Sequence, residues 1–265
     1  MMALQLMDSV RQLLADVEEA AGKKISPVEK PELPVPVIFN LPDNNSYRID
    51  LYYNPRDHEQ IDYALACQAG HLLRFFAAPP AERFVSVANR RTMAVFIMET
   101  ESELERLTTI FGREKVRQLI ARWYQGVVFQ LTRMPTDIMV NKWLHDRFPE
   151  LRPRQLQGLA AQREQALRSL TPEVRRATPA RIYQAANIMN FVFFKILEDH
   201  LQADFLGPYH GTIFILAGAA LARITAARRE DGHAGDRAMI DAWAAMLELD
   251  RWYEWQTYEK FSSPP

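Results

Sequence analysis

The sequence contains a single cysteine, Cys67, among its 265 residues. One cysteine cannot form an intrachain disulfide, so no disulfide framework supports the fold. The first residues also lack the basic segment, apolar core and cleavage site of a secretory signal peptide. We therefore expect a cytoplasmic location, where thiols stay reduced.

Long apolar runs and an excess of one charge are missing as well. The longest apolar run covers residues 211–222, whereas a helix needs about 20 apolar residues to cross a bilayer. The formal net charge is −1, so no overall field attracts nucleic acid or an anionic membrane. The densest arginine zone, 147–181, is interspersed with glutamates and is typical of a solvated face. We expect neither a nucleic-acid partner nor a membrane partner.

The chain is long enough to bury a large core. Apolar residues make up 48% of it and aromatic residues 11%, and domains usually contain about 100–200 residues. We expect one compact body. No phosphate-binding loop, G-x-G-x-x-G or G-x-S-x-G motif is present to assign an activity to it.

The N-terminal quarter predicts a helix followed by a hairpin. Residues 1–22 place apolar side chains three and four apart, which predicts an amphipathic helix that packs on the body or docks on a partner. Residues 23–36 carry four prolines among charges and are predicted to be an extended connector. Residues 37–41 and 47–53 predict the two strands of a hairpin, because apolar residues alternate in the second run.

Helical patterns cover most of the chain from about residue 100 onward. The predicted helices are 101–111, 113–131, 135–148, 152–170, 180–200, 209–229 and 235–258. The predicted fold class is therefore α+β and mainly helical. A small N-terminal strand-plus-helix element packs on a C-terminal helical body, with 151–265 continuing the same body as 37–150.

An apolar helix after the second predicted strand carries Cys67 and His71. Residues four apart share one face of a helix, so both side chains point the same way, with Gln68 beside them. The five residues from Cys67 to His71 read Cys-Gln-Ala-Gly-His. In H-E-x-x-H, the two histidines hold Zn²⁺ and the glutamate takes a proton from the metal-bound water. Here a cysteine stands at the first position, and the glutamine cannot accept that proton.

The strand, turn and helix over residues 47–76 resemble the core of zincins, in particular minimal metallopeptidase-like proteins. The resemblance implies a zincin-like region at 37–150. In gluzincins a third ligand, a carboxylate, comes from a later helix, and the resemblance places it near Asn141. An asparagine binds Zn²⁺ poorly, so Asp137 and His145, one turn to either side, are the possible substitutes.

The candidate metal ligands are therefore Cys67, His71 and Asp137. Thiolate and imidazole suit Zn²⁺, but two ligands from one helix are too few without a third. The alternative for Asp137 is a charge near a helix N-terminus, worth about 0.3–1 kcal/mol. We expect no cofactor, and Zn²⁺ is the one candidate.

Nucleophilic catalysis is a second chemistry for the same residues. Cys67 and His71 are close enough on a helix for a Cys-His pair, and with Gln68 they are the candidate catalytic residues. The sequence places no group to orient His71, and a mid-helix thiol gains no pKa lowering from a helix N-terminus. Burial of both side chains in the core is the structural alternative.

Candidates for partner binding lie in two places. The second predicted strand borders a groove in which an extended peptide could add as a further strand. Its candidate residues are Tyr47, Ile49, Leu51 and Tyr53. The C-terminal stretch is rich in aromatic residues, and Trp252 and Trp255 are its candidates because tryptophan anchors interfaces. Core packing is the alternative for both tryptophans.

These observations favour a catalytically inactive zincin-like module, a pseudo-metallopeptidase that binds or regulates a protein or peptide partner. One alternative is a hydrolase that uses Cys67 and His71 as metal ligands or as a nucleophile pair. Another is a structural subunit that makes contacts through its aromatic C-terminal helix. An enzyme needs Cys67 and His71 exposed in a cleft, whereas a scaffold can leave them buried.

Overall fold

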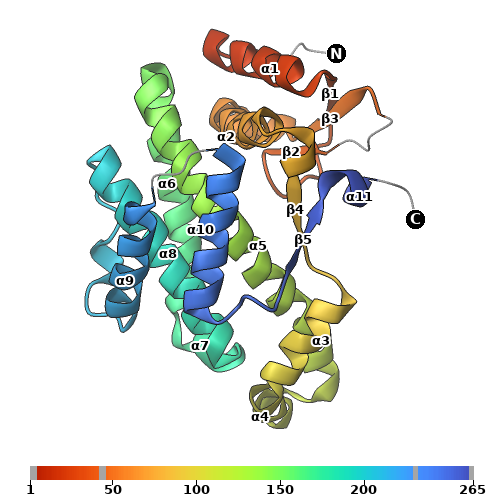
Figure 1. The fold of residues 1–265 in the computed structure, drawn as a ribbon. Coiled ribbons are helices and arrows are strands. Elements are labelled where there is room, and N and C mark those ends of the chain that lie inside the picture. The colour runs from red at the N-terminus through yellow and green to blue at the C-terminus, as the bar shows by residue number, and fades with distance from the viewer. Residues whose placement is uncertain (1–4, 42–45, 229–231, 263–265) are drawn as a thin grey trace.

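The computed structural model describes residues 5–41, 46–228 and 232–262, and its fold is mainly helical α+β (Figure 1). The strands are β1 (Lys24–Glu29), β2 (Val37–Asn40), β3 (Arg48–Tyr53), β4 (Phe84–Val87) and β5 (Glu254–Thr257). The helices are α1 (Asp8–Ala21), α2 (His58–Ala77), α3 (Arg90–Glu99), α4 (Glu101–Phe111), α5 (Arg113–Arg147), α6 (Arg152–Leu167), α7 (Pro172–Ala177), α8 (Ala180–Leu201), α9 (Phe214–Ala227), α10 (Gly232–Leu247) and α11 (Tyr258–Ser262).

The N-terminal sheet has the strand order β1-β3-β2. The hairpin prediction is confirmed, since β2 pairs antiparallel with β3 and the alternating residues Ile49 and Leu51 are buried. The predicted connector at 23–36 is wrong over its first half, because β1 pairs in parallel with the other side of β3. Pro27 lies within β1, where an edge strand tolerates the missing N–H.

Helix α1 covers one side of this element. Val10, Leu13 and Val17 lie three and four residues apart and are almost fully buried in the same cluster as the sheet and α2. The helix ends at Gly22, whose φ of 63° suits glycine. The predicted helix in 1–22 is therefore confirmed over its described part, and it packs on the body.

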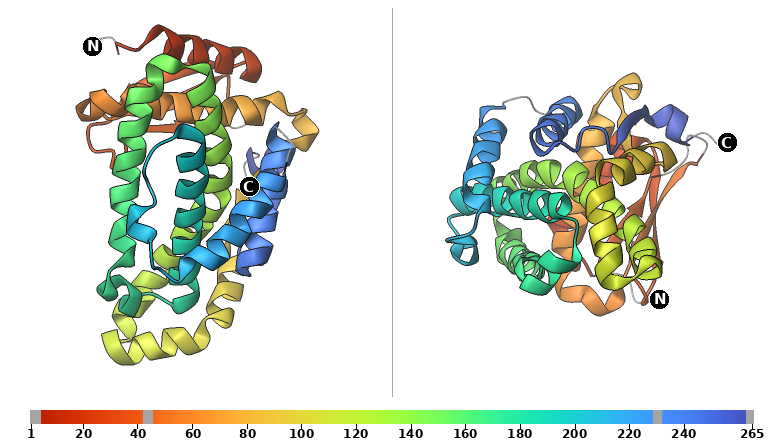
Figure 2. Two further views of the ribbon diagram at one scale, coloured as in Figure 1. Left: turned by 90° about the vertical axis from the view of Figure 1, so that its left-hand side faces the viewer. Right: turned by 90° about the horizontal axis from the view of Figure 1, so that it is seen from below.

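Helix α5 runs through the centre of the molecule and contacts α2, α8 and α10 (Figures 1 and 2). The prediction of two helices at 113–131 and 135–148 is wrong, because one helix continues through Pro135. A proline inside a helix costs about 3 kcal/mol. Burial of Leu131 and Ile138 on either side of Pro135 outweighs that cost.

The C-terminal helix is shorter than the predicted 235–258. Helix α10 ends at Leu247 because Glu248 adopts a φ of 58° and the Leu249 N–H bonds back to the Ala244 carbonyl. The chain then forms β5, which pairs antiparallel with β4. No glycine stands at this turn, so nothing in the sequence signals the end of the helix. The helical spacing of the apolar residues therefore predicted that the helix continues to residue 258. Among the described helices, none is long and apolar enough to cross a membrane.

A matched glycine pair tests the packing of the helical body. A Cβ at Gly218 of α9 would overlap the buried Phe191 ring on α8, whereas a Cβ at the exposed Gly126 of α5 meets no atom within 4 Å. We expect Gly218→Ala to lower the free energy of unfolding by about 1–3 kcal/mol through overpacking. Gly126→Ala should raise it by up to about 1 kcal/mol. Urea unfolding measures both, and stabilisation by Gly218→Ala would contradict the tight contact of α8 with α9.

Candidate functional site

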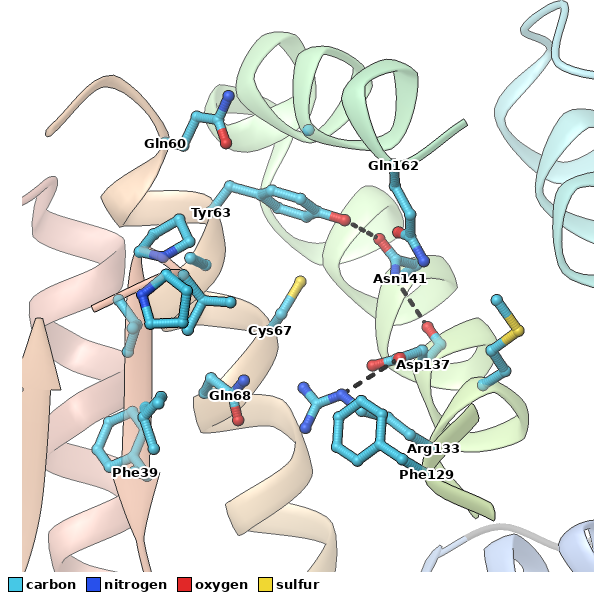
Figure 3. A pocket seen from close by; sticks show the side chains of 18 of the residues that line it. Phe39, Gln60, Tyr63, Cys67, Gln68, Phe129, Arg133, Asp137, Asn141 and Gln162 are labelled. Atoms are coloured by element: carbon cyan, nitrogen blue, oxygen red, sulfur yellow. Dashed lines mark hydrogen bonds and ion pairs between the residues drawn. The ribbon is translucent and has the colours of Figure 1, made fainter. Parts of the chain in front are cut away.

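A cleft of about 730 Å³ lies between the N-terminal sheet and α5 (Figure 3). Strand β2 and the residues before it form one wall, and α2 contributes Tyr63, Cys67 and Gln68. Helices α5 and α6 form the opposite wall. Phe39, Gln68 and Arg133 also line a second pocket of about 360 Å³, so the two pockets adjoin along one cleft.

The wall formed by β2 is the edge of its sheet. Asn54 N–H donates to the Pro36 carbonyl, which makes residues 36 and 54 a hydrogen-bonded pair. Hydrogen-bonded and non-hydrogen-bonded pairs alternate along an antiparallel ladder. In the register of β2, Val37 and Phe39 therefore direct their N–H and C=O groups away from β3 and toward the cleft.

The structure brings Cys67, His71 and Asp137 to this cleft from two helices. His71 Nε2 and Asp137 Oδ1 lie 2.5 Å apart, and Arg133 Nε lies 3.4 Å from the other carboxylate oxygen. Burial opposes ionisation of Asp137, but Arg133 and His71 outweigh it and hold the pKa of the carboxyl below its usual value. Asp137 is mid-helix, so the prediction of a helix N-terminal charge is wrong.

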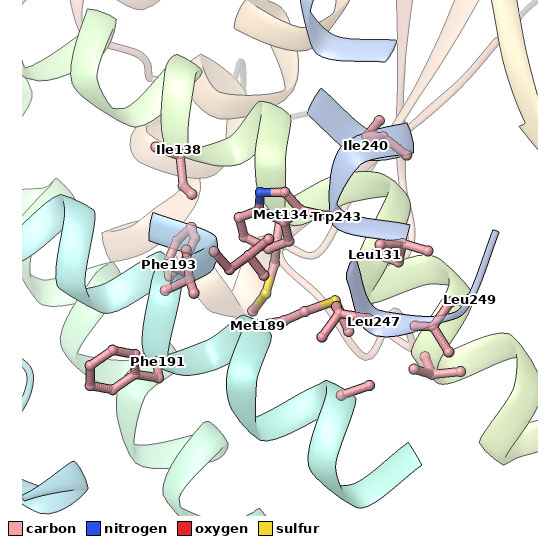
Figure 4. Packing of buried hydrophobic residues seen from close by; sticks show 14 of the residues in the cluster. Leu131, Met134, Ile138, Met189, Phe191, Phe193, Ile240, Trp243, Leu247 and Leu249 are labelled. Atoms are coloured by element: carbon pink, nitrogen blue, oxygen red, sulfur yellow. The ribbon is translucent and has the colours of Figure 1, made fainter. Parts of the chain in front are cut away.

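Gly70 permits the close approach of α2 to α5 that joins His71 to Asp137. A Cβ at this position would lie 2.7 Å from Cγ1 of Val140, a distance that real Cβ atoms do not tolerate. The opposite face of α5 is fixed in the helical core, where Ile138 packs in the same cluster as Trp243 (Figure 4). Both helices are therefore held in place around the cleft.

Asn141, at the position where the zincin resemblance places a ligand, is a structural side chain. It is almost fully buried, accepts a hydrogen bond from the Tyr63 hydroxyl and donates to the Asp137 carbonyl. Gln155 of α6 donates to the Asn141 side chain and backbone. The amide thus links α2, α5 and α6. His145 pairs with Gln155 and lies against His200, and it does not line the cleft.

Cys67 is held as a neutral thiol. Burial raises the pKa of this thiol to about 12, and the nearby Asp137 carboxylate acts in the same direction. Within the described residues no hydrogen bond joins Cys67 to His71. Gln68, half-buried beside it, offers an amide and no proton acceptor of carboxylate strength.

The donor set around Cys67 does not fit zinc in this arrangement. His71 Nε2 is engaged by Asp137, and the Arg133 guanidinium adds a positive charge that repels a dication. A thiol must lose its proton to bind Zn²⁺, which the surroundings of Cys67 oppose. In the part of the chain that the structure describes, no three His, Cys, Asp or Glu side chains form a group that could hold a metal ion.

The second pocket extends the cleft toward α10 and the β4–β5 pair. Its charged lining residues include Arg133, Asp236 and Arg237, and His233 also lines it. Arg74 of α2 makes two 2.8 Å bonds to the Asp236 carboxylate and so ties α2 to α10. His233 Nε2 accepts a hydrogen bond from the Phe84 N–H of β4.

Two of the predicted partner-binding sets need correction. Strand β3 is the centre of its sheet and pairs on both sides, so the strand of Tyr47 to Tyr53 cannot accept a further strand. Ile49, Leu51 and Tyr53 are buried, and only Tyr47, just before β3, is well exposed. Trp252 is fully buried, and its indole N–H donates a hydrogen bond to the Glu99 carboxylate. For Trp252, the alternative of core packing is therefore correct. Trp255 is half-buried and lines the second pocket.

Sequence reasoning missed Arg133, Phe129 and Arg237 as cleft residues. Phe129, Arg133 and Asp137 lie four residues apart on α5, and that spacing places them on one helix face. The signal was therefore present, but the predicted break before Pro135 separated Asp137 from the other two. Nothing local marks Arg237, because the contacts that bring α10 to the cleft are long-range.

No family model matches this chain, and neither a curated protein nor a solved structure matches it. The fold class rests on the structure itself. The resemblance to zincins stays a prediction from residues 47–76.

The state of Cys67 can be tested by alkylation, because the chain has no other thiol. A pKa of about 12 leaves very little thiolate near neutral pH. We expect iodoacetamide to label the folded protein at least about a hundredfold more slowly than the urea-unfolded chain. Mass spectrometry of intact protein gives both rates. Equal rates would mean that Cys67 is an accessible, reactive thiol.

Proposed function

We propose that this chain is a non-catalytic, zincin-like binding module whose cleft receives an extended segment of a protein or peptide partner in a reducing compartment such as the cytoplasm. One observation carries the proposal. The cleft combines the free edge of β2 with the Asp137 carboxylate, which is neutralised by Arg133 and His71. Such a site offers backbone groups to a ligand and no activated water.

The side chains at the site support a module that does not catalyse peptide hydrolysis. Gln68 stands where a zincin has its general base, and removal of such a base costs about 10²–10⁴ in rate. The neutral Cys67 thiol and the engaged His71 nitrogen are poor zinc ligands as they stand. Arg133 supplies a fixed positive charge beside the carboxylate.

The walls of the cleft support an extended ligand. Val37 and Phe39 present backbone donors and acceptors, as strand addition requires. On the opposite wall, the Phe129 side chain is 64% exposed, although it lines the cleft. An exposed aromatic side chain at a cleft is typical of a residue that anchors a partner.

A hydrolase is the second candidate, and one observation favours it. Asp137 hydrogen-bonds to His71, as the orienting group of a nucleophile pair would. The raised pKa of the Cys67 thiol opposes this reading.

Metal content tests the non-catalytic part of the proposal. We expect the purified protein and His71→Ala to contain equally little zinc, because the site lacks a free ligand set. Elemental analysis of both proteins gives the answer, and a casein cleavage assay with added zinc serves as a second measurement. Stoichiometric zinc that disappears in His71→Ala, or zinc-dependent cleavage, would overturn the proposal.

Peptide selection tests the binding part. We expect a display library of unstructured decapeptides to yield ligands, and Phe129→Ala to weaken them by about tenfold or more. The control is Leu216→Ala, which truncates an exposed apolar side chain on α9, away from the cleft.

Backbone methylation of a selected peptide then distinguishes strand addition from other modes of binding. N-methylation should abolish binding at every second residue, because only alternate N–H groups of an added strand face β2. Equal tolerance at all positions, or a library that yields no ligand, would contradict the proposed function.

A further inference from the structure

The cleft carries more positive than negative charge where its two pockets adjoin. Arg133 and Arg237 both line the second pocket, next to Gln68 and to Phe39 at the edge strand. Both arginines come from the helical body, on α5 and α10. The formal net charge of the whole chain is −1, so this excess is a local feature of the cleft.

Two carboxylates lie where the pockets adjoin, Asp137 in the lining of the first and Asp236 in that of the second, and both are already neutralised. Asp137 is shared by His71 and Arg133, and Asp236 receives two hydrogen bonds from Arg74. Arg133 and Arg237 line the second pocket, and Arg74 is engaged by Asp236. Asp137 and Asp236 are thus paired with Arg133 and Arg74, and among the described residues the charge of Arg237 has no ion-pair partner.

Arg237 carries this uncompensated charge. Its guanidinium carbon lies 3.8 Å from the centre of the Phe84 ring and 5.1 Å from that of Trp255. Its Nε is buried and, within the described residues, has no hydrogen-bond acceptor and no carboxylate at ion-pair distance. Contact with two aromatic rings fixes the position of the guanidinium group and leaves its charge available to a ligand.

Arg133 also has donors to spare. Among the described residues its one ion pair uses Nε, and its two terminal nitrogens have no hydrogen-bond partner. Figure 3 shows the guanidinium group extending from α5 into the cleft toward Gln68. A guanidinium group whose terminal donors are free is suited to pair with a carboxylate.

We infer that Arg133 and Arg237 bind an acidic side chain of the extended segment that lies along β2, so the partner is an acidic peptide. This inference rests on the proposed function and specifies its ligand. Backbone bonds to β2 would hold the strand, and the acidic side chain would supply the missing counter-charge. Phe39 of β2 lines the second pocket. A strand added beside β2 would therefore place one of its side chains in this pocket.

Pools of fluorescent nonapeptides, random except at the centre, test the inference by anisotropy. In two pools both ends of the peptide are blocked, and the central residue is glutamate in one of them and glutamine in the other. A third pool has a central glutamine and a free C-terminal carboxylate. We expect the glutamate pool to bind about tenfold more tightly than the blocked glutamine pool, because a charged hydrogen bond replaces a neutral one. Added salt should reduce that preference.

Substitution of either arginine should remove the preference for glutamate. In Arg133→Gln and Arg237→Gln, we expect the glutamate and glutamine pools to bind within about twofold of each other. Arg133→Lys keeps the charge beside Asp137 and guards against loss of folding, which thermal unfolding monitors. The matched control is Arg122→Gln, an exposed arginine on α5 outside both pockets, which should retain the full preference.

The outcomes separate the two proposals. Equal binding of the glutamate and glutamine pools to the unmodified protein would overturn the acidic-peptide inference and leave the binding module in place. Tight binding confined to the pool with the free C-terminus would overturn the side-chain assignment in favour of a terminal carboxylate. If no pool binds and the decapeptide library also yields no ligand, the proposed function itself fails.

Discussion

A half-buried carboxylate in a cleft must be neutralised, and the neutralisation of Asp137 is the interaction on which the site depends. His71 from α2 and Arg133 from α5 each approach one carboxylate oxygen. The pairing requires α2 and α5 to lie in close contact, which Gly70 allows because it has no side chain to meet Val140. The same pairing occupies the histidine nitrogen, while burial and, to a lesser extent, the Asp137 carboxylate raise the pKa of the Cys67 thiol. An internal salt bridge thus stands where the zincin resemblance would place a metal.

In the proposed binding mode, the edge strand and the arginines would act on different parts of a ligand. Strand β2 offers backbone groups, which recognise any extended chain regardless of its sequence. Arg133 and Arg237 carry charge and can distinguish one side chain from another. Phe129, on the wall opposite β2, adds apolar contact. Recognition of the ligand backbone would therefore come from β2, and recognition of its side chains from α5 and α10.

Local pattern was enough to predict much of the fold. The period-two run of β3 and the three-and-four spacing of α1 were read correctly, since each reflects burial of one face. Three errors had physical causes. The prolines, Pro27 among them, led to the prediction of a connector, because proline disfavours central strands. Strand β1 is an edge strand, which tolerates proline. Pro135 suggested a helix start, because the packing that retains it inside α5 is not visible in the sequence. The turn at Glu248 was missed because a residue other than glycine adopts the left-handed conformation there.

The sequence by itself determined the mainly helical α+β class and the shared face of Cys67 and His71, because both follow from contacts between residues close together in the chain. It also determined that a glutamine, Gln68, and no carboxylate follows Cys67 on this helix. Only the tertiary structure decided that Asp137 meets His71, that Asn141 is a buried link between helices, and that β2 rather than β3 borders the cleft. It alone placed Arg237 beside Arg133. These pairs are separated by tens of residues or more, and which distant side chains meet depends on how whole helices pack against one another.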